Sequence, residues 1–355
     1  MMLNPRNCCR VAIASIVLSA AVAAHADLLV GDSIAYDVPS PVLRFADGAT
    51  GNSIAIDAFG TDLANGTDVL REASAITYEP QENVLYVADF VGKAIRVYAA
   101  SASGNAPALR VLNPPALGQA RRVAIDGVHD ELITVYGGCC LAVYSRMASG
   151  SAVTPLRTVQ YGGTPGSLTR LNYPTGVVLR AASDEMVAPD SGTADNTPFG
   201  VVLFFPRSAS GNVAPSRTIE GPATKLGTAA YYIAYDGEHD EIMVVAEDAS
   251  VFPAVVRINT FAGNASGNSA PLRSISGDAT LLEAIHAISY DRYSGSLLVS
   301  EGGENGAVPR VLVFPRTANG NVAPARVLNA GPNSFTTPRA VEAIPGPVVF
   351  ANGFE

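Results

Sequence analysis

The chain has 355 residues, of which only 15% are charged, and it contains 33 glycines, 24 prolines and no tryptophan. This composition is typical of many short strands joined by tight turns, and it argues against a mainly helical or disordered chain. The formal net charge of −9 argues against a nucleic-acid-binding protein, which normally presents a basic face.

Residues 1–26 have the pattern of a secretory signal peptide. Arg6 and Arg10 give a positively charged start, residues 11–24 form a short apolar run, and Ala24-His25-Ala26 matches an A-x-A cleavage site. The run is too short to span a bilayer, and no later segment is long enough either. We therefore expect an exported protein without a transmembrane segment, periplasmic or extracellular after cleavage near Ala26.

One hairpin-like sequence pattern occurs five times along the chain. Residues 201–221 (VVLFFPRSASGNVAPSRTIEG) read as an apolar strand, a Ser-Gly-Asn turn, and a second strand that carries an arginine. The same pattern recurs at residues 95–112, 141–159, 255–275 and 310–328. A period of about fifty residues indicates an array of structural repeats.

Two further strand-like runs precede each hairpin, so each repeat supplies four strands of a small antiparallel sheet. Such a sheet cannot bury both of its faces alone, but equal sheets arranged around an axis cover one another. The sequence therefore predicts an all-β fold, a six-bladed β-propeller with four-stranded antiparallel blades. The blades are expected to start near residues 76, 123, 177, 233, 288 and 341.

The sixth blade is predicted to be closed by strands from both ends of the chain. Residues 340–344 supply a first strand, residues 28–33 match a second, residues 34–38 a third, and residues 41–45 a fourth. A single propeller domain then spans residues 27–344, and a C-terminal tail follows at 345–355. The tail ends in VVFANGFE, which is interpreted as a sorting or attachment signal or an extra strand.

Two residue types recur on the predicted outer strand of every blade. A proline stands at its start, where a missing N–H is harmless, and an arginine follows, which discourages edge pairing with another molecule. Because these residues recur with the repeat, they are interpreted as scaffold. They are Pro41, Pro107, Pro155, Pro215, Pro271 and Pro324, with Arg44, Arg110, Arg157, Arg217, Arg273 and Arg326.

Cys139 and Cys140 are the only cysteines left after removal of residues 1–26. Adjacent cysteines allow a vicinal disulfide, a link to another chain, or two buried thiols. We favour buried thiols, since free cysteine commonly packs as a small hydrophobe. A redox function would need a separated pair such as C-x-x-C, which the sequence lacks.

Residues 85–105 (LYVADFVGKAIRVYAASASGN) resemble the NHL repeat, in which an apolar strand, V-A-D, a short loop and another apolar strand follow one another. The resemblance extends over most of residues 27–344 and is looser outside this segment. It implies a six-bladed propeller that serves mostly for binding. Some related propellers are lyases or hydrolases with a metal in the central channel.

Five of the six blades place an acid directly after the predicted second strand. At a channel mouth, these acids would bind a cationic ligand or a hard cation such as Ca²⁺. The alternative, which we favour, is that each acid accepts N–H bonds from a loop. The acids are Asp32, Asp89, Asp190, Glu247 and Glu301; blade two has Tyr136 and Gly137 instead. Asp190, Asp195, Glu247 and Asp248 exceed the plain repeat and are the metal-ligand candidates, although no EF-hand spacing is present.

His286 is the one candidate general base. His129 and His239 occupy matching turn positions, whereas His286 breaks the repeat at the start of an inner strand. The related metal-dependent lyases use several channel histidines, which this chain lacks. No nucleophile elbow and no phosphate-binding loop are found.

These features predict an exported, monomeric binding or scaffold module without enzymatic activity. Its small-molecule or protein ligand is expected on the face of the ring where the five acids follow the second strands. No resident cofactor is required. The alternative is a metal-dependent hydrolase of lactonase type, with a divalent cation in the channel and His286 as base. A third possibility is a surface protein that binds a protein partner through the Ser-Gly-Asn turns of the repeated hairpins.

Overall fold

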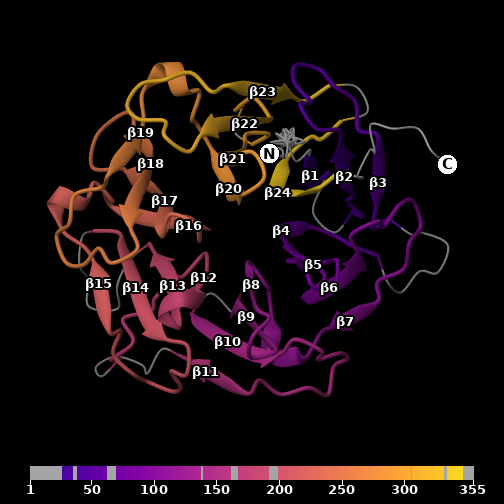
Figure 1. The fold of residues 1–355 in the computed structure, drawn as a ribbon, viewed down its shortest axis with the longest axis horizontal. Coiled ribbons are helices and arrows are strands. Elements are labelled where there is room, and N and C mark those ends of the chain that lie inside the picture. Colours follow the sequence, from indigo (N-terminus) through magenta and orange to yellow (C-terminus); the bar gives the residue numbers. More distant parts are fainter. Residues whose placement is uncertain are drawn as a thin grey trace, which may run out of the picture.

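The computed structural model describes residues 26–34, 38–61, 69–136, 139–160, 167–191, 199–304, 306–331 and 334–346. Residues 1–25 of the predicted signal peptide and 347–355 of the predicted tail lie outside this part. In the described part, six four-stranded antiparallel sheets form a ring (Figure 1), as the sequence predicts. The helices in it are single 3-10 turns: η1 (Pro115–Leu117), η2 (Ala181–Ser183), η3 (Pro222–Thr224) and η4 (Asp278–Thr280).

Each blade runs from an inner to an outer strand. Blade 1 contains β4 (Ala73–Glu79), β5 (Val84–Asp89), β6 (Ala94–Ala99) and β7 (Arg110–Leu112). Blade 2 contains β8 (Val123–Asp126), β9 (Glu131–Tyr136), β10 (Cys140–Ser145) and β11 (Arg157–Val159). Blade 3 contains β12 (Val178–Arg180), β13 (Glu185–Asp190), β14 (Val201–Pro206) and β15 (Arg217–Ile219).

The remaining blades complete the ring. Blade 4 contains β16 (Ala229–Asp236), β17 (Glu241–Asp248), β18 (Val255–Ala262) and β19 (Arg273–Ile275). Blade 5 contains β20 (Ile285–Asp291), β21 (Ser296–Glu301), β22 (Arg310–Pro315) and β23 (Arg326–Asn329). Blade 6 contains β24 (Pro338–Pro345), β1 (Ala26–Asp32), β2 (Val42–Phe45) and β3 (Asp57–Phe59), in that spatial order.

Blade 6 confirms that strands from both ends close the ring, but the predicted positions of its third and fourth strands are wrong. β1 pairs with β24 from Ala26↔Pro345 to Asp32↔Pro338, so it is the second strand. Val42–Phe45 is the third strand, β2, and not the fourth, which is β3. Ile34 and Val38 are not in a strand, and residues 35–37 lie outside the described part.

The hydrophobic core lies between blades rather than inside them. Each cluster of buried side chains joins two neighbouring blades; Phe45 of blade 6, for example, packs in one cluster with Val311 and Leu328 of blade 5. Blade 6 also shares a cluster with blade 1, through Leu29, Val42 and Tyr98. This arrangement is the physical reason for the ring, because each sheet hides its apolar faces only against its neighbours.

The glycine of each Ser-Gly-Asn turn also connects neighbouring blades. Its N–H donates to a carbonyl of the preceding blade, as from Gly211 N to Thr158 O at 2.6 Å and from Gly267 N to Thr218 O at 2.6 Å. Both glycines have positive φ, 77° and 59°, which glycine adopts without steric cost. The repeated turn is thus part of the scaffold. The same bridge is made by Gly51, Gly104, Gly150 and Gly320.

Most of the repeated arginines lie on the outer strands, where they also hold blades together. Arg157 binds both carboxylate oxygens of Glu131 at 2.6 Å within its blade, and donates to Arg207 O of the next blade at 2.7 Å. Arg44 is an exception, since it lies on β2, and Asp57 takes the outer-strand position opposite it. Arg44 still reaches the next blade at Ala100 O.

Candidate functional site: an arginine-lined channel mouth

Four of the five repeated acids are buried inside the scaffold. Asp89 is fully buried and accepts hydrogen bonds from Arg71 N at 3.2 Å, Glu72 N at 3.1 Å and Gly92 N at 2.9 Å, with Arg96 Nε at 2.9 Å. Two of these N–H groups belong to the loop that enters β4. The carboxylate therefore fixes the crossover between two blades.

The other buried acids act in the same way on the loops before β24, β12 and β20. Asp32 accepts from Thr337 N at 2.7 Å, Asp190 from Asn172 N at 2.8 Å, and Glu301 from Glu283 N at 2.9 Å. Burial raises the pKa of Glu301 above its ordinary value, although Arg310 Nε lies 2.6 Å away. These contacts are the loop caps that the repeat argument favoured.

Glu247 and Asp248 are half-buried at the end of the longer strand β17. The pKa of Asp248 is lowered, chiefly by the hydroxyl of Ser250, and Asp248 lies 3.9 Å from Arg257. Asp195 lies outside the described residues. Glu247 is thus the repeated acid whose side chain is most accessible to a ligand.

The channel mouth on this face is basic rather than acidic. A cavity of about 250 Å³ is lined by three arginines and a single glutamate, with aromatic and hydroxyl side chains between them. Two of its arginines, Arg121 and Arg122, directly precede the inner strand β8, and Arg339 is the second residue of the inner strand β24. The lining residues are Glu72, Ser74, Phe90, Arg121, Arg122, Thr175, Tyr232, His286 and Arg339.

Arg122 extends across the channel. Its Nη2 donates to His286 O at 2.7 Å, which belongs to blade 5, opposite blade 2 in the ring. Nη1 donates to Arg121 O at 3.3 Å, and the guanidinium lies 4.7 Å from the centre of the Tyr232 ring. Burial lowers the pKa of Arg122 to about 10, so the group stays charged at neutral pH. Within the described residues it has no carboxylate partner, which is costly for a charge that is half-buried.

Arg121 is held by aromatic rings. Its guanidinium lies 4.9 Å from the Phe90 ring centre and 5.0 Å from that of Tyr173, and it donates to Tyr173 Oη at 2.6 Å. Such cation–π contacts fix the side chain without neutralising it. In the described part of the chain, Arg121 also makes no ion pair with a carboxylate. Two adjacent, uncompensated cations therefore face the mouth.

His286 is buried, and both of its ring nitrogens have partners. Nε2 lies 3.0 Å from Gly302 O and therefore carries the proton, while Nδ1 lies 3.3 Å from Arg339 Nη1. Burial and the neighbouring Arg339 lower the pKa of His286 to about 4. The ring is thus neutral near pH 7 and orients Arg339, which also pairs with Glu304.

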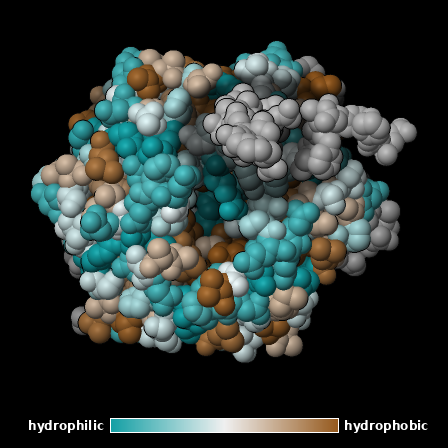
Figure 2. Space-filling view, viewed as in Figure 1, coloured by the Kyte–Doolittle hydropathy of each residue, from teal (hydrophilic) through white to brown (hydrophobic). Residues whose placement is uncertain are grey.

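A second cavity of about 630 Å³ occupies the channel beyond Arg122, and Arg122 belongs to the walls of both cavities. Figure 2 shows the molecule hollowed near its centre, with hydrophilic residues in the hollow. Glu342 lines this channel cavity. Its Oε2 accepts from Ser289 Oγ at 3.1 Å and its Oε1 from Ala343 N at 3.1 Å. Burial raises the pKa of Glu342 to about 8, so its carboxyl group is mainly neutral at pH 7.

We expect Glu342→Gln to remove a pH dependence of stability. The pKa of Glu342 is about 8 in the folded chain against an ordinary 4.5, so its contribution is complete below pH 4.5 and is lost as the pH rises to about 8. At pH 8.5 the variant should be more stable by roughly 2–4 kcal/mol. Urea unfolding of both proteins at pH 5, 7 and 8.5 measures this difference. A constant difference across the three pH values would contradict it.

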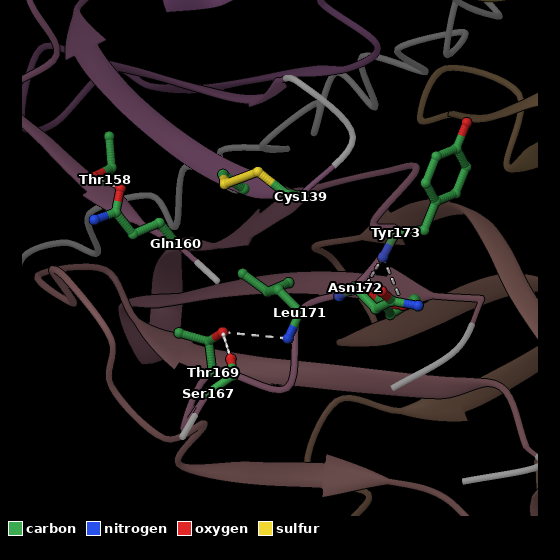
Figure 3. Close-up of a disulfide and its surroundings, with 10 residues drawn as sticks. Cys139, Thr158, Gln160, Ser167, Thr169, Leu171, Asn172 and Tyr173 are labelled. Carbon is green, nitrogen blue, oxygen red and sulfur yellow. Dashed lines mark hydrogen bonds between the residues drawn. A yellow bond between two sulfur atoms is a disulfide. The ribbon is translucent and has the colours of Figure 1, made fainter. Parts of the chain in front are cut away.

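Cys139 and Cys140 form a vicinal disulfide with an S–S distance of 2.16 Å, so the prediction of free buried thiols is wrong. The bridge lies at the start of β10, whose first residue is Cys140. Figure 3 shows Leu171, Asn172 and Tyr173 among its surroundings. Tyr173 accepts a hydrogen bond from Arg121, so the surroundings of the disulfide include a residue that holds one of the mouth arginines.

Among the described residues, one group has the geometry to hold a metal ion: Asp126, His129 and Asp184. It lies away from the mouth, at the turns between first and second strands. The cation position there is taken by Arg207, whose Nε lies 2.6 Å from Asp184 and 3.6 Å from Asp126. The group is therefore explained by an ion pair of the scaffold.

The chain is similar to a solved structure described as a nidogen/laminin complex, with a TM-score of 0.57 and 10% identity over 90% of this chain and 98% of that chain. This likeness shows the fold. Hydrazine synthase of Kuenenia stuttgartiensis is also similar, with a TM-score of 0.46 and 8% identity over 68% of this chain and 62% of that chain. No family model and no curated protein matches the sequence. The described residues include no helix with the length and hydropathy of a membrane span.

Proposed function

We propose that the chain is a binding module for small organic anions, with the binding site at the arginine-lined mouth. The observation that supports this most directly is the charge of Arg122, which is half-buried, extends across the channel and lacks a carboxylate partner in the described part. A guanidinium binds a carboxylate or phosphate through two parallel hydrogen bonds. An anion at the mouth would supply the charge that the scaffold omits.

The positive charge of the mouth cavity distinguishes this proposal from cation binding. The side chains that surround the mouth cavity include three arginines and one glutamate, Glu72. Burial raises the pKa of Glu72. Four of the five repeated acids are already bound to backbone N–H groups. An anion is therefore favoured over a cation at this face.

The proposal also includes that the chain is an NHL-like propeller and that it is exported. Residues 1–26 supply the sequence pattern for export. The vicinal disulfide adds support, because disulfides persist in oxidising compartments outside the cytosol. Most NHL-type propellers bind a ligand, in agreement with an anion-binding module.

Calorimetric titration of the purified protein with acetate, benzoate and phosphate tests the proposal. We expect binding of at least one of these anions, and Arg122→Met should weaken it about 10- to 100-fold, since a charge-assisted hydrogen bond contributes roughly 1.5–3 kcal/mol. The variant should fold, because it removes a half-buried charge that has no carboxylate partner in the described part.

Arg257→Met is the matched control for this titration. It removes the same charge from β18, where Arg257 lies 3.9 Å from Asp248, and should leave the affinity unchanged. The proposal is wrong if no anion binds to the wild-type protein, or if Arg122→Met binds the anions as tightly as Arg257→Met does.

A further inference from the structure

The channel cavity beyond Arg122 differs from the mouth in its chemistry. At the level of Glu342, two residues before the end of the inner-strand repeat, the other blades carry small or uncharged side chains. These are Thr77, Ala124, Val178, Ala234 and Ser289. Glu342 is thus the single acid at this level in the described strands. Such a pattern leaves room for a guest beside one carboxyl group.

Glu342 has hydrogen-bond capacity to spare. Its two oxygens accept from Ser289 Oγ and Ala343 N, and within the described part of the chain no cation pairs with it. The charged groups that act on it are Arg292 and Asp291, from the end of β20; β4 offers Thr77 and Tyr78 on its other side. Because burial raises the pKa of Glu342 to about 8, its O–H remains available as a donor below that pH.

Arg122 and Glu342 lie at a definite spacing along the channel. Arg122 is two residues before Ala124, and Ala124 shares the level of Glu342. A strand rises by about 3.3 Å per residue, so the two levels are about 7 Å apart along the strands. The carboxylate and the terminal oxygen of an extended six-carbon hydroxy acid are separated by a similar length.

We propose that the channel binds elongated organic anions whose anionic head meets Arg122 and whose uncharged body lies in the channel cavity, with a hydroxyl or carbonyl oxygen accepting a hydrogen bond from Glu342. This inference rests on the proposed function, and it names the class of ligand. The small side chains around Glu342 make room for a linear body. The single carboxyl group selects bodies with a polar atom at the matching distance from the head.

The test uses calorimetry with acetate, hexanoate and 6-hydroxyhexanoate at pH 6.5. For the wild-type protein, 6-hydroxyhexanoate should bind at least tenfold more tightly than acetate and about fivefold more tightly than hexanoate. Glu342→Leu should abolish the preference for 6-hydroxyhexanoate over hexanoate and leave acetate binding unchanged. Glu342→Gln retains a neutral donor and should retain the preference.

A pH series gives a second readout that does not depend on how well the leucine variant folds. The preference of the wild-type protein for 6-hydroxyhexanoate should decline between pH 7 and 9 as Glu342 ionises, whereas Glu342→Gln should show no decline. Equal affinities for the three probes, or a pH profile shared by both proteins, would overturn the inference. If acetate still required Arg122, the proposed function would stand alone; if no probe bound, both would fail.

Discussion

Removal of residues 27–45 is expected to abolish cooperative folding of the whole ring. The deletion removes β1 and β2, and β1 is hydrogen-bonded to β24 on one side and to β2 on the other. Leu29, Val30, Val42 and Phe45 are fully buried, and they belong to the clusters that join blade 6 to both of its neighbours. Blade 6 would therefore lose its apolar contacts with both blade 5 and blade 1.

The free energy lost with these side chains is comparable to the total stability of the domain. Burial of a large apolar side chain contributes about 1.5–3 kcal/mol, so four of them contribute roughly 6–12 kcal/mol. The total stability of a folded domain is about 5–15 kcal/mol. The loss therefore equals most of the stability available, before the hydrogen bonds of two strands are considered.

Circular dichroism and calorimetric melting of a chain that begins at residue 46 measure this effect. The full chain should show one sharp transition, and the truncated chain a broad transition or none. Addition of a synthetic peptide covering residues 27–45 should restore the transition, because ring closure is non-covalent at the β1–β24 pair. A truncated chain that melts as the full chain does would show that the ring is stable with blade 6 incomplete.

The repeat could be predicted because its physics is local. Alternating apolar residues, a positive-φ glycine in the turn and a proline before the outer strand occur within about twenty residues of one another, and they recur in each blade. The sequence prediction for the third and fourth strands of blade 6 is wrong because Pro41 and Arg44 match the outer-strand pattern. The segment Ala49-Thr50-Gly51-Asn52 was the signal that identifies Val42–Phe45 as the third strand, since it matches Ala-Ser-Gly-Asn elsewhere.

The mouth could not be predicted in the same way, because its contacts join distant parts of the chain. Arg122 reaches a carbonyl 164 residues away, and no periodic pattern reports such a pair. The one available signal was a departure from the repeat: Arg121-Arg122 stands just before an inner strand where blade 1 has Ser74-Ala75 and blade 3 has Thr175-Gly176. Glu342 departs from the repeat likewise, among small residues at its level. Repeated residues built the scaffold here, and exceptions to the repeat formed the channel.

This contrast leads to a second large effect, at Asp89. Asp89→Ala should destabilise the protein by about 3–5 kcal/mol, because it removes a buried carboxylate that pairs with the buried Arg96 and deprives three backbone N–H groups of their acceptor. Glu247→Ala is the control, since Glu247 is the acid at the same end of the second strand in blade 4, one residue beyond the register position of Asp89, and is only half-buried. Its cost should stay below about 1 kcal/mol.

Urea unfolding of the two variants at pH 7 separates a structural acid from an accessible one. A large loss for Asp89→Ala beside a small loss for Glu247→Ala would place the acids after the second strands in the scaffold, according to their burial. Equal small losses would mean that the buried carboxylate of Asp89 contributes no more than a surface charge, and the loop-cap interpretation would then be wrong. Because the loop held by Asp89 carries Phe90, whose ring lies 4.9 Å from the Arg121 guanidinium at the mouth, Asp89→Ala should also weaken anion binding, whereas loss of a pure surface charge would leave it unchanged.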